Sequence, residues 1–340
     1  MVRSSDGAHE THRFARLLFI TFAKASTLRD NRQIFDLLRK KQFFWQYNTV
    51  SLKILENVPL GPKTTMRIGG TARYFVELES KADLEAAWRL KTEKKLPLIV
   101  LGGGSNSIFA DGMIQAVVVQ IKAGSMKTDD GKVTVGAGKY LASLVTECSA
   151  LGLDFSALTG IPGTVGGAVF GNAGQGPKGI WTDSFLIEVE VFDGGSWKTF
   201  KRAEGGFGYR DSVFKKMPGV LIWEAVFSPP RRPSAEIEAE IKKLLQHRKE
   251  AQLFGRTAGS CFKGLPDGTP AWKLIDAAGL RGLKSGGVQI SEKHANFLVN
   301  FDGKGTFSDA VAIVDKVRSS VPQLKGVEMR FVESDGKVRY

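Results

Sequence analysis

The sequence predicts an α+β protein in which two mixed lobes precede a third unit. Strand-like β-branched runs alternate with helix-like stretches from about residue 50 onward. Three prolines, Pro229, Pro230 and Pro233, interrupt this alternation and indicate a linker. A chain of 340 residues is long enough for two or three domains with a substantial core.

The first lobe, expected over residues 50–125, combines strands with one helix. Ser80 can cap that helix, because its hydroxyl and the Asp83 carboxylate occupy reciprocal capping-box positions. The helix is expected to end near residue 94. The strands of this lobe are expected over residues 72–78, 96–101 and 117–121.

The second lobe, expected over residues 126–229, is richer in strands. Its helix is expected over residues 140–151, where apolar side chains recur at helical spacing and place Cys148 in the core. Its strands are expected over residues 133–135, 187–192 and 220–227.

The third unit, expected over residues 234–340, begins with a charged amphipathic helix that runs to about residue 254. Thr306 and Asp309 form a second capping-box pair at the start of its last helix, which Pro322 ends. Another helix is expected between Pro270 and Gly279, and strands over 288–290 and 297–299.

Composition restricts the class of partner. The net charge of +13 favours anionic ligands, but the chain carries neither a nucleic-acid-binding signature nor a zinc-ligand spacing. No apolar run reaches the length of a membrane span, so we expect no stable membrane insertion. Only two cysteines occur, which favours a reducing compartment. Residues 1–49 form a basic leader whose role the sequence does not indicate.

The stretch LGGGSN at residues 101–106 follows an apolar strand and has two interpretations. It is either a tight turn or a loop whose backbone N–H groups approach a phosphate. It lacks the order of a dinucleotide fingerprint, and no helical pattern follows it directly. On its own the stretch therefore favours a tight turn.

Three further segments change this balance. The run IPGTVGGA at 161–168, with GNAG at 171–174, holds more small residues than a core needs and suits a backbone wrapped closely around a flat or phosphorylated ligand. The other two segments are GYRDSVF at 208–214 and AGSCFK at 258–263.

Together with LGGGSN and MRIGG at 66–70, these segments resemble the UDP-N-acetylenolpyruvoylglucosamine reductase family over about residues 50–340. The resemblance implies a two-lobed FAD-binding fold of the vanillyl-alcohol-oxidase type at 50–229, followed by a C-terminal α/β substrate-binding domain at 234–340. It implies NADPH-dependent, FAD-mediated reduction of UDP-N-acetylglucosamine enolpyruvate to UDP-N-acetylmuramate in peptidoglycan precursor synthesis. We expect a cytoplasmic monomer with non-covalently bound FAD.

The resemblance also assigns site residues. Arg210 would hold the substrate carboxylate, Ser260 would donate a proton to the α-carbon, and Glu328 would donate a hydrogen bond to the developing enolate. Hydride addition to an enolpyruvyl ether requires such groups, because negative charge develops on the α-carbon and its carboxylate. Tyr209 and Lys263 would contact the substrate. The implied FAD-binding residues are Gly102, Gly103, Gly104, Ser105, Asn106, Ile161, Pro162, Gly163, Thr164, Gly166, Gly167, Ala168 and Asn172.

The charged candidates also have structural interpretations that the sequence leaves open. Arg210 could form a surface ion pair with Asp211, and Glu328 could pair with Arg330 at a strand edge.

The remaining candidates are open in the same way. Ser260 could be an ordinary strand-edge serine, and Lys263 could be solvated. Cys261 is expected to face the opposite way from Ser260 and to pack in the core. His294 could be structural or could bind a ligand.

Two departures from the family pattern concern substrate contacts. Gly264-Leu265-Pro266 follows the Phe-Lys pair, where the family usually has Asn-Pro. Gln175-Gly176-Pro177 stands where many relatives have Ala-Tyr-Gly, and the resemblance then implies the family's shorter type, which lacks a substrate-capping tyrosine loop.

Two other functions are open from sequence. The chain could be another FAD-dependent oxidoreductase of this fold that acts on an alcohol or a hydroxy acid, or a catalytically silent basic binding protein. Ser260 and Glu328 favour the reductase, because an oxidase would more often use a histidine or tyrosine base.

Overall fold

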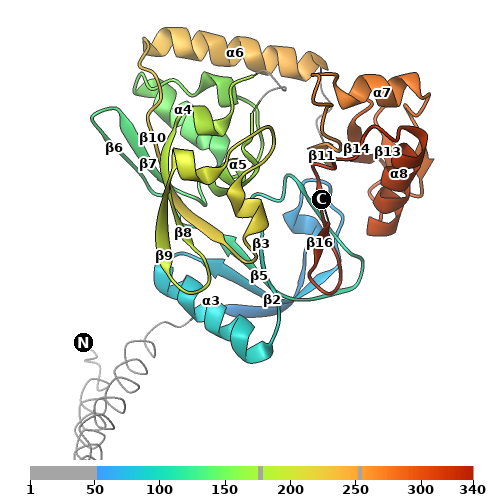
Figure 1. The fold of residues 1–340 in the computed structure, drawn as a ribbon, viewed down its shortest axis with the longest axis horizontal. Coiled ribbons are helices and arrows are strands. Elements are labelled where there is room, and N and C mark those ends of the chain that lie inside the picture. Colours follow the sequence, from blue (N-terminus) through green and yellow to red (C-terminus); the bar gives the residue numbers. More distant parts are fainter. Residues whose placement is uncertain (1–51, 175–178, 252–254, 340) are drawn as a thin grey trace, which may run out of the picture. The chain divides into compact units, whose positions relative to one another are not determined.

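The computed structural model describes residues 52–174, 179–251 and 255–339, so the expected leader at 1–49 lies outside the described residues. The strands of the described part form four sheets (Figure 1). Within the same part, no helix combines the length and the apolar character that a membrane crossing requires.

The first sheet has the strand order β1-β2-β5-β3, with β1 antiparallel to β2 and the other pairs parallel. The helix after β2 begins where the sequence predicted, because Ser80 and Asp83 form the complete capping box. β3 is shorter than expected: Pro97 precedes it without an N–H to donate, and the glycines after Leu101 turn the chain away. The elements are β1 (Ile54–Pro59), β2 (Thr71–Leu78), α3 (Lys81–Lys94), β3 (Leu98–Val100) and β5 (Met113–Ile121).

The second sheet is antiparallel throughout, in the order β6-β7-β10-β8-β9. Cys148 is fully buried on its helix, and burial raises the pKa of the thiol to about 12, which confirms a packing role. The elements are β6 (Met126–Asp129), β7 (Lys132–Gly136), α4 (Leu141–Ala150), β8 (Leu186–Phe192), β9 (Trp197–Lys201) and β10 (Leu221–Phe227).

A short helix that the sequence did not indicate, α5 (Val165–Gly171), packs against this second sheet. Thr164 caps it by accepting a hydrogen bond from the Gly167 N–H, and Asn172 ends it in the left-handed conformation. Three of its seven residues are glycine, which lowers intrinsic helix propensity and hides the helix from a sequence pattern.

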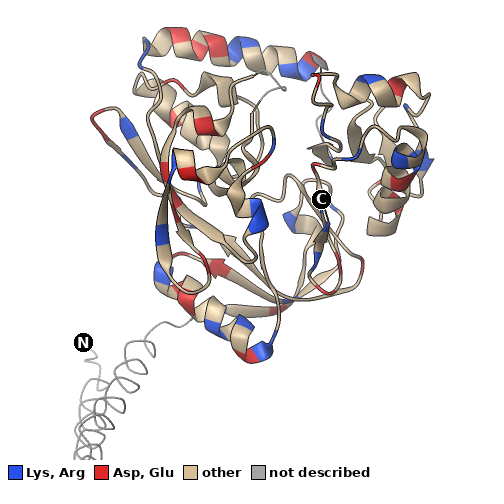
Figure 2. Cartoon of the chain, in the orientation of Figure 1, with Lys and Arg blue, Asp and Glu red and all other residues tan. Residues whose placement is uncertain are grey.

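The third sheet has the order β11-β14-β13-β12, and α8 packs against it, whereas α6 contacts α4 of the second lobe. Thr306 and Asp309 form the predicted capping box of α8. Figure 2 shows acidic residues in the first half of α6 and mainly basic residues in its second half, in line with its charged sequence. The elements are α6 (Ser234–Ala251), β11 (Thr257–Ser260), α7 (Ala271–Ala277), β12 (Lys284–Ser285), β13 (Val288–Ile290), β14 (Phe297–Asn300) and α8 (Phe307–Ser320).

The last strands return to the first lobe. β15 (Arg330–Val332) lies parallel to β4 (Ser107–Phe109), which directly follows LGGGSN, and β16 (Val338–Arg339) completes this three-stranded sheet. The Asp111 carboxylate, just beyond β4, accepts hydrogen bonds from the first N–H groups of α8. Segments more than 200 residues apart are therefore joined at the end of the glycine loop.

Two hydrophobic clusters meet at the first sheet. Phe75 and Val118 belong to the cluster that includes the third unit, whereas Val76 and Val119 belong to the cluster that includes the second lobe. Because successive strand residues point to opposite faces, the middle parts of β2 and β5 are buried on both sides of the first sheet. The second lobe and the third unit thus both pack against the first lobe.

The capping box of α3 gives a testable prediction. Ser80→Ala should lower the free energy of unfolding by about 0.5–2 kcal/mol, because the Asp83 N–H loses its acceptor at the helix start. Chemical denaturation measures the change. Ser80→Thr keeps a capping hydroxyl and serves as the control, so an equal loss in both variants would contradict the capping role.

Candidate active site

The site is assembled around the backbone of Glu328. The Asn106 side chain donates a hydrogen bond to the Glu328 carbonyl at 2.9 Å, and the Arg330 N–H donates to the Asn106 carbonyl at 2.9 Å. On its other side the Glu328 N–H donates to the Cys261 carbonyl at 2.7 Å. These contacts place Glu328 between the glycine loop and the segment that carries Ser260.

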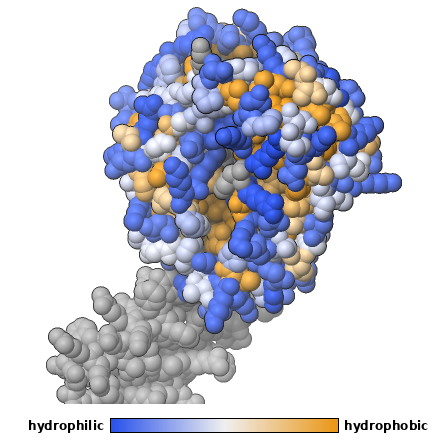
Figure 3. Space-filling model, turned by 45° about the vertical axis from the view of Figure 1, so that its right-hand side comes forward, coloured by the Kyte–Doolittle hydropathy of each residue, from blue (hydrophilic) through white to orange (hydrophobic). Residues whose placement is uncertain are grey.

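A cavity of about 530 Å³ adjoins this assembly. Apolar side chains such as Ile99, Phe170 and Phe214 form much of its wall. Two cations, Lys215 and Arg330, also line it: Lys215 acts on Glu328, and Arg330 acts on Lys215. The space-filling view shows an apolar hollow bordered by hydrophilic residues (Figure 3). The cavity can therefore accept a ligand with a flat apolar part and an anionic part.

The two glycine-rich segments approach each other at van der Waals distance. A Cβ atom on Gly103 would lie 2.8 Å from the Gly163 Cα, closer than real Cβ atoms come. A Cβ on Gly104, which has φ +67°, would lie 2.1 Å from the Lys63 carbonyl oxygen. The Ser105 hydroxyl donates to the Pro162 carbonyl at 3.1 Å and ties the segments together. Close packing of backbone on backbone is thus a structural reason for these glycines.

Part of the predicted FAD-binding set lines the cavity: Gly102, Thr164, Gly166 and Gly167. Asn172 is fully buried, and its amide is used by the protein itself. The amide nitrogen donates to the Gly208 carbonyl at 3.0 Å, and its oxygen accepts from the Asp183 N–H at 3.0 Å. Ala168 is also buried. The assignment of these residues to a cofactor stays a prediction.

Arg210 lies in a tight turn with an unusual backbone. Its φ of +53° falls in the left-handed region, which residues other than glycine rarely adopt. Residues with such strained backbone are concentrated at functional sites. Its guanidinium Nε lies 3.2 Å from Glu328 Oε2. Arg210 and Glu328 therefore form an ion pair with each other. This pair stands in place of the two that the sequence left open, Arg210 with Asp211 and Glu328 with Arg330. Tyr209 lies beside it, with the guanidinium 5.8 Å from the ring centroid.

Burial raises the pKa of Glu328 above its usual range, although Arg210, Lys263 and Lys215 act in the opposite direction. The same carboxyl adds to the rise that burial causes in the pKa of the Tyr209 hydroxyl. A carboxyl with a raised pKa can hold a proton near neutral pH and donate a hydrogen bond. Glu328 is therefore suited to act beside an anionic ligand.

Ser260 ends β11, and the residues that follow it are fixed from two sides. Asn296 uses its amide to bond both the N–H and the carbonyl of Phe262 at 2.9 Å, and its own carbonyl accepts from the Cys261 N–H. Glu328 binds the opposite side of the same segment. Cys261 is buried, and burial raises its thiol pKa, so it packs in the core as expected, whereas Ser260 is partly exposed.

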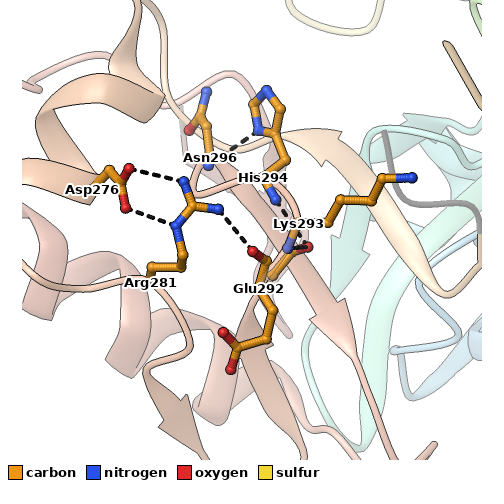
Figure 4. Close-up of polar contacts among 7 residues, drawn as sticks. Asp276, Arg281, Glu292, Lys293, His294 and Asn296 are labelled. Atoms are coloured by element: carbon orange, nitrogen blue, oxygen red, sulfur yellow. Dashed lines mark hydrogen bonds and ion pairs between the residues drawn. The ribbon is translucent and has the colours of Figure 1, made fainter. Parts of the chain in front are cut away.

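Asn296 is a positioning residue that sequence reasoning missed, and a polar network holds its own loop (Figure 4). Arg281 forms a two-pronged bond with the Asp276 carboxylate at 2.7 and 2.9 Å and donates to the Glu292 carbonyl at 2.8 Å. His294 accepts from the Asn296 N–H through Nδ1 at 3.3 Å, and burial lowers its pKa. These contacts support the structural interpretation of His294.

Besides Arg210, the charged side chains that act on Glu328 are cations. Lys263 and Lys215 both act on its carboxylate, and Arg330 acts on Lys215. Arg248 donates to the Gly160 carbonyl at 2.9 Å and feels the charge of Arg210. The site therefore combines one buried carboxyl with an excess of positive charge, which suits a polyanionic ligand. Only proximity in the fold could have revealed Lys215, Arg248 and Arg330.

Within the described ranges, no three or more His, Cys, Asp or Glu side chains are grouped so that they could hold a metal ion. Of the two departures from the family pattern, residues 175–177 lie outside the described residues. Gly264, at the other, presents its backbone to the Tyr209 hydroxyl.

Lys215 gives a pH-dependent prediction. Burial and the charge of Lys263 lower its pKa from 10.5 to about 8. Its proton therefore costs folding free energy below about pH 8, and this cost is relieved as the pH rises from about 8 to 10.5. Acetylation of Lys215, followed by mass spectrometry, should titrate with a midpoint of about pH 8, because only the neutral amine reacts. Normalisation to the exposed Lys216 removes changes in the reagent, and a midpoint near 10.5 would contradict the burial of the charge.

Comparisons with known proteins agree with this geometry. A family model described as UDP-N-acetylenolpyruvoylglucosamine reductase, C-terminal domain, matches residues 248–331, and one described as FAD binding domain matches residues 72–196. The UDP-N-acetylenolpyruvoylglucosamine reductase of Geotalea uraniireducens is 35% identical over 278 residues, 80% of this chain and 90% of that protein. The reductase of a Bradyrhizobium species is 37% identical over 290 residues, 82% of this chain and 91% of its own length.

Among solved structures, the crystal structure of UDP-N-acetylenolpyruvylglucosamine reductase from Thermus caldophilus matches with a TM-score of 0.70 and 34% identity. The match covers 82% of this chain and 98% of that one. The predicted fold class, an FAD-binding fold followed by a C-terminal domain, is confirmed. The chain belongs to the UDP-N-acetylenolpyruvoylglucosamine reductase family.

Proposed function

We propose that the protein reduces UDP-N-acetylglucosamine enolpyruvate to UDP-N-acetylmuramate in the cytoplasm, with NADPH as reductant and FAD as mediator. One observation carries the proposal: Arg210 pairs with the buried Glu328, which is bonded through its backbone to the segment of Ser260. This trio combines a cation, a carboxyl with a raised pKa and a hydroxyl, the three groups that reduction of an enolpyruvyl ether requires.

The residues around the cavity fit FAD. Gly102 and Gly167 present backbone without side chains, and the apolar wall with Lys215 and Arg330 suits a flat ring system joined to an anionic diphosphate. When bound, FAD would relay a hydride equivalent from the nicotinamide to the enolpyruvyl group. We propose that Gly102, Thr164, Gly166 and Gly167 hold it. The close contact between the glycine-rich segments at 101–106 and 161–168 would keep this binding site closed.

Arg210 would hold the substrate carboxylate, because its planar guanidinium can bond both oxygens while Glu328 keeps it oriented. The protonated form of Glu328 would donate a hydrogen bond to the same group as negative charge develops there. Ser260, on the segment that the Glu328 N–H bonds, would deliver the proton that the α-carbon gains. These assignments place Glu328 and Ser260 on two segments that are joined at Cys261, and Arg210 on the turn at residues 208–211.

The excess of cations supports a substrate with several negative charges. Lys215, Lys263, Arg248 and Arg330 accompany Arg210, whereas the carboxylates beside them are Glu328 and Asp211. A nucleoside-diphosphate sugar with an enolpyruvyl carboxylate has this character. We propose that residues 50–229 bind FAD, that residues 234–340 contribute the substrate face, and that the enzyme acts as a monomer.

The half-reactions test the role of Ser260. Ser260→Ala should retain FAD and be reduced by NADPH at a near-normal rate, because no proton reaches the substrate carbon in that stage. Reoxidation by the enolpyruvyl substrate should slow by at least ~10²-fold, the low end of what a positioned proton donor contributes. Stopped-flow absorbance follows the two stages separately.

Two further variants sharpen this test. Ser260→Cys should retain more reoxidation activity than Ser260→Ala, because a thiol can still donate a proton. Arg210→Lys should also slow reoxidation, because it loses the two-pronged grip on the carboxylate. Slower flavin reduction by NADPH in Ser260→Ala, or unchanged reoxidation, would refute the assigned role.

The close contact between these two glycine-rich segments gives a second prediction. Gly103→Ala should lower the FAD content of the purified protein, because its Cβ would push against the Gly163 backbone and part the two segments. The ratio of flavin absorbance to protein measures this. Gly171→Ala is the matched control, since its Cβ would meet no atom within 4 Å. Equal FAD content in both variants would show that the close approach does not matter for the cofactor.

A further inference from the structure

The turn that carries Arg210 is anchored from three directions. Gly208 and Asp211 pair with each other through both backbone hydrogen bonds, at 3.1 and 3.2 Å. Asn172 holds the Gly208 carbonyl, and the Ser212 hydroxyl donates to the Phe170 carbonyl at 2.7 Å. The proposed function assigns a role to the Arg210 side chain in this turn. It does not address the contacts that hold the turn in place.

The third anchor is Lys215. Its ammonium group donates a hydrogen bond to the Arg210 carbonyl at 2.6 Å, from the 3₁₀ turn Val213–Lys216 that follows directly. Arg210 itself is in the left-handed conformation, with φ +53°. That conformation is unfavourable for a residue with a side chain, so it persists only where neighbouring contacts hold it.

Lys215 is also well placed to feel the site. Its side chain forms part of the cavity wall. The charged groups that act on it are Lys263, Asp211, Glu328 and Arg330, so it lies between the cavity and the Arg210–Glu328 pair. A lysine that served only solubility would extend into water, as the exposed Lys216 does.

We propose that Lys215 is a positioning residue for the reductase reaction: by holding the Arg210 carbonyl, it fixes the turn that aims the Arg210 guanidinium at Glu328. The proposal rests on the proposed function for its kinetic consequence, but its structural half concerns the turn alone. The hydrogen bond, rather than the charge, is the essential contribution, because the Arg210 carbonyl is the group that Lys215 touches.

Three variants separate the possible contributions. Lys215→Met keeps the length of the chain but removes both donor and charge, whereas Lys215→Gln keeps a donor without the charge. Lys216→Met is the matched control, because it makes the same change one residue away on an exposed side chain. Each variant is studied as the full-length protein with its flavin.

The kinetic readout is the split between half-reactions. Lys215→Met should be reduced by NADPH at a near-normal rate, while reoxidation by the enolpyruvyl substrate slows by roughly 10²-fold, the cost of a misplaced group. Lys215→Gln should lie closer to the unmodified protein, and Lys216→Met should equal it. Equal impairment of Lys215→Gln and Lys215→Met, or an unslowed Lys215→Met, would overturn the proposal.

Hydrogen exchange tests the turn without reference to the reaction. In Lys215→Met the amides of Gly208 and Asp211 should exchange roughly 10-fold faster or more, because the turn loses a charge-assisted hydrogen bond. Lys216→Met should show no change there. If the unmodified enzyme fails to reduce the enolpyruvyl substrate, the proposed function fails, and the exchange of this turn still decides whether Lys215 holds it. Unchanged exchange in Lys215→Met would refute the role of Lys215.

Discussion

The pairing between β4 and β15 is the contact on which the site depends. Asn106, at the end of the glycine loop, exchanges hydrogen bonds with residues 328 and 330 near the end of the chain. Without this pairing Glu328 would have no fixed place opposite Arg210, and the bond from its N–H to Cys261 would not align the Ser260 segment. One parallel strand pair therefore brings together three segments that are far apart in sequence.

The electrostatics of the site follow from this arrangement. A carboxyl that is taken out of water favours its protonated form, while the cations around it favour the charged form. At Glu328 burial prevails over Arg210, Lys263 and Lys215. The same balance lowers the pKa of Lys215, which is crowded by other cations. Burial thus opposes charge on both Glu328 and Lys215, whereas an incoming polyanion would favour the charged form of Lys215.

The sequence predicted what local rules control. Both capping boxes, at Ser80 and Thr306, were correct because the partners lie three residues apart on one chain segment. The burial of Cys148 followed from helical spacing. The helix at Val165–Gly171 was missed, because its glycines disfavour a helix that packing and the Thr164 cap nevertheless stabilise. The partner of Arg210 and the supports from Asn296 and Lys215 could not be predicted, since they arise from contacts that no spacing encodes.

The central place of the first lobe in both hydrophobic clusters has a consequence for biosynthesis. Its sheet contributes to both hydrophobic clusters, and the strand that pairs with β4 lies within the last eleven or so residues of the sequence. A nascent chain that still lacks Arg330–Val332 leaves the edge of β4 without its backbone partner, and an open strand edge is a template for pairing with other chains. The first lobe is thus translated early but closed only once Arg330–Val332 has been made, so a chain truncated before residue 330 would be prone to aggregation.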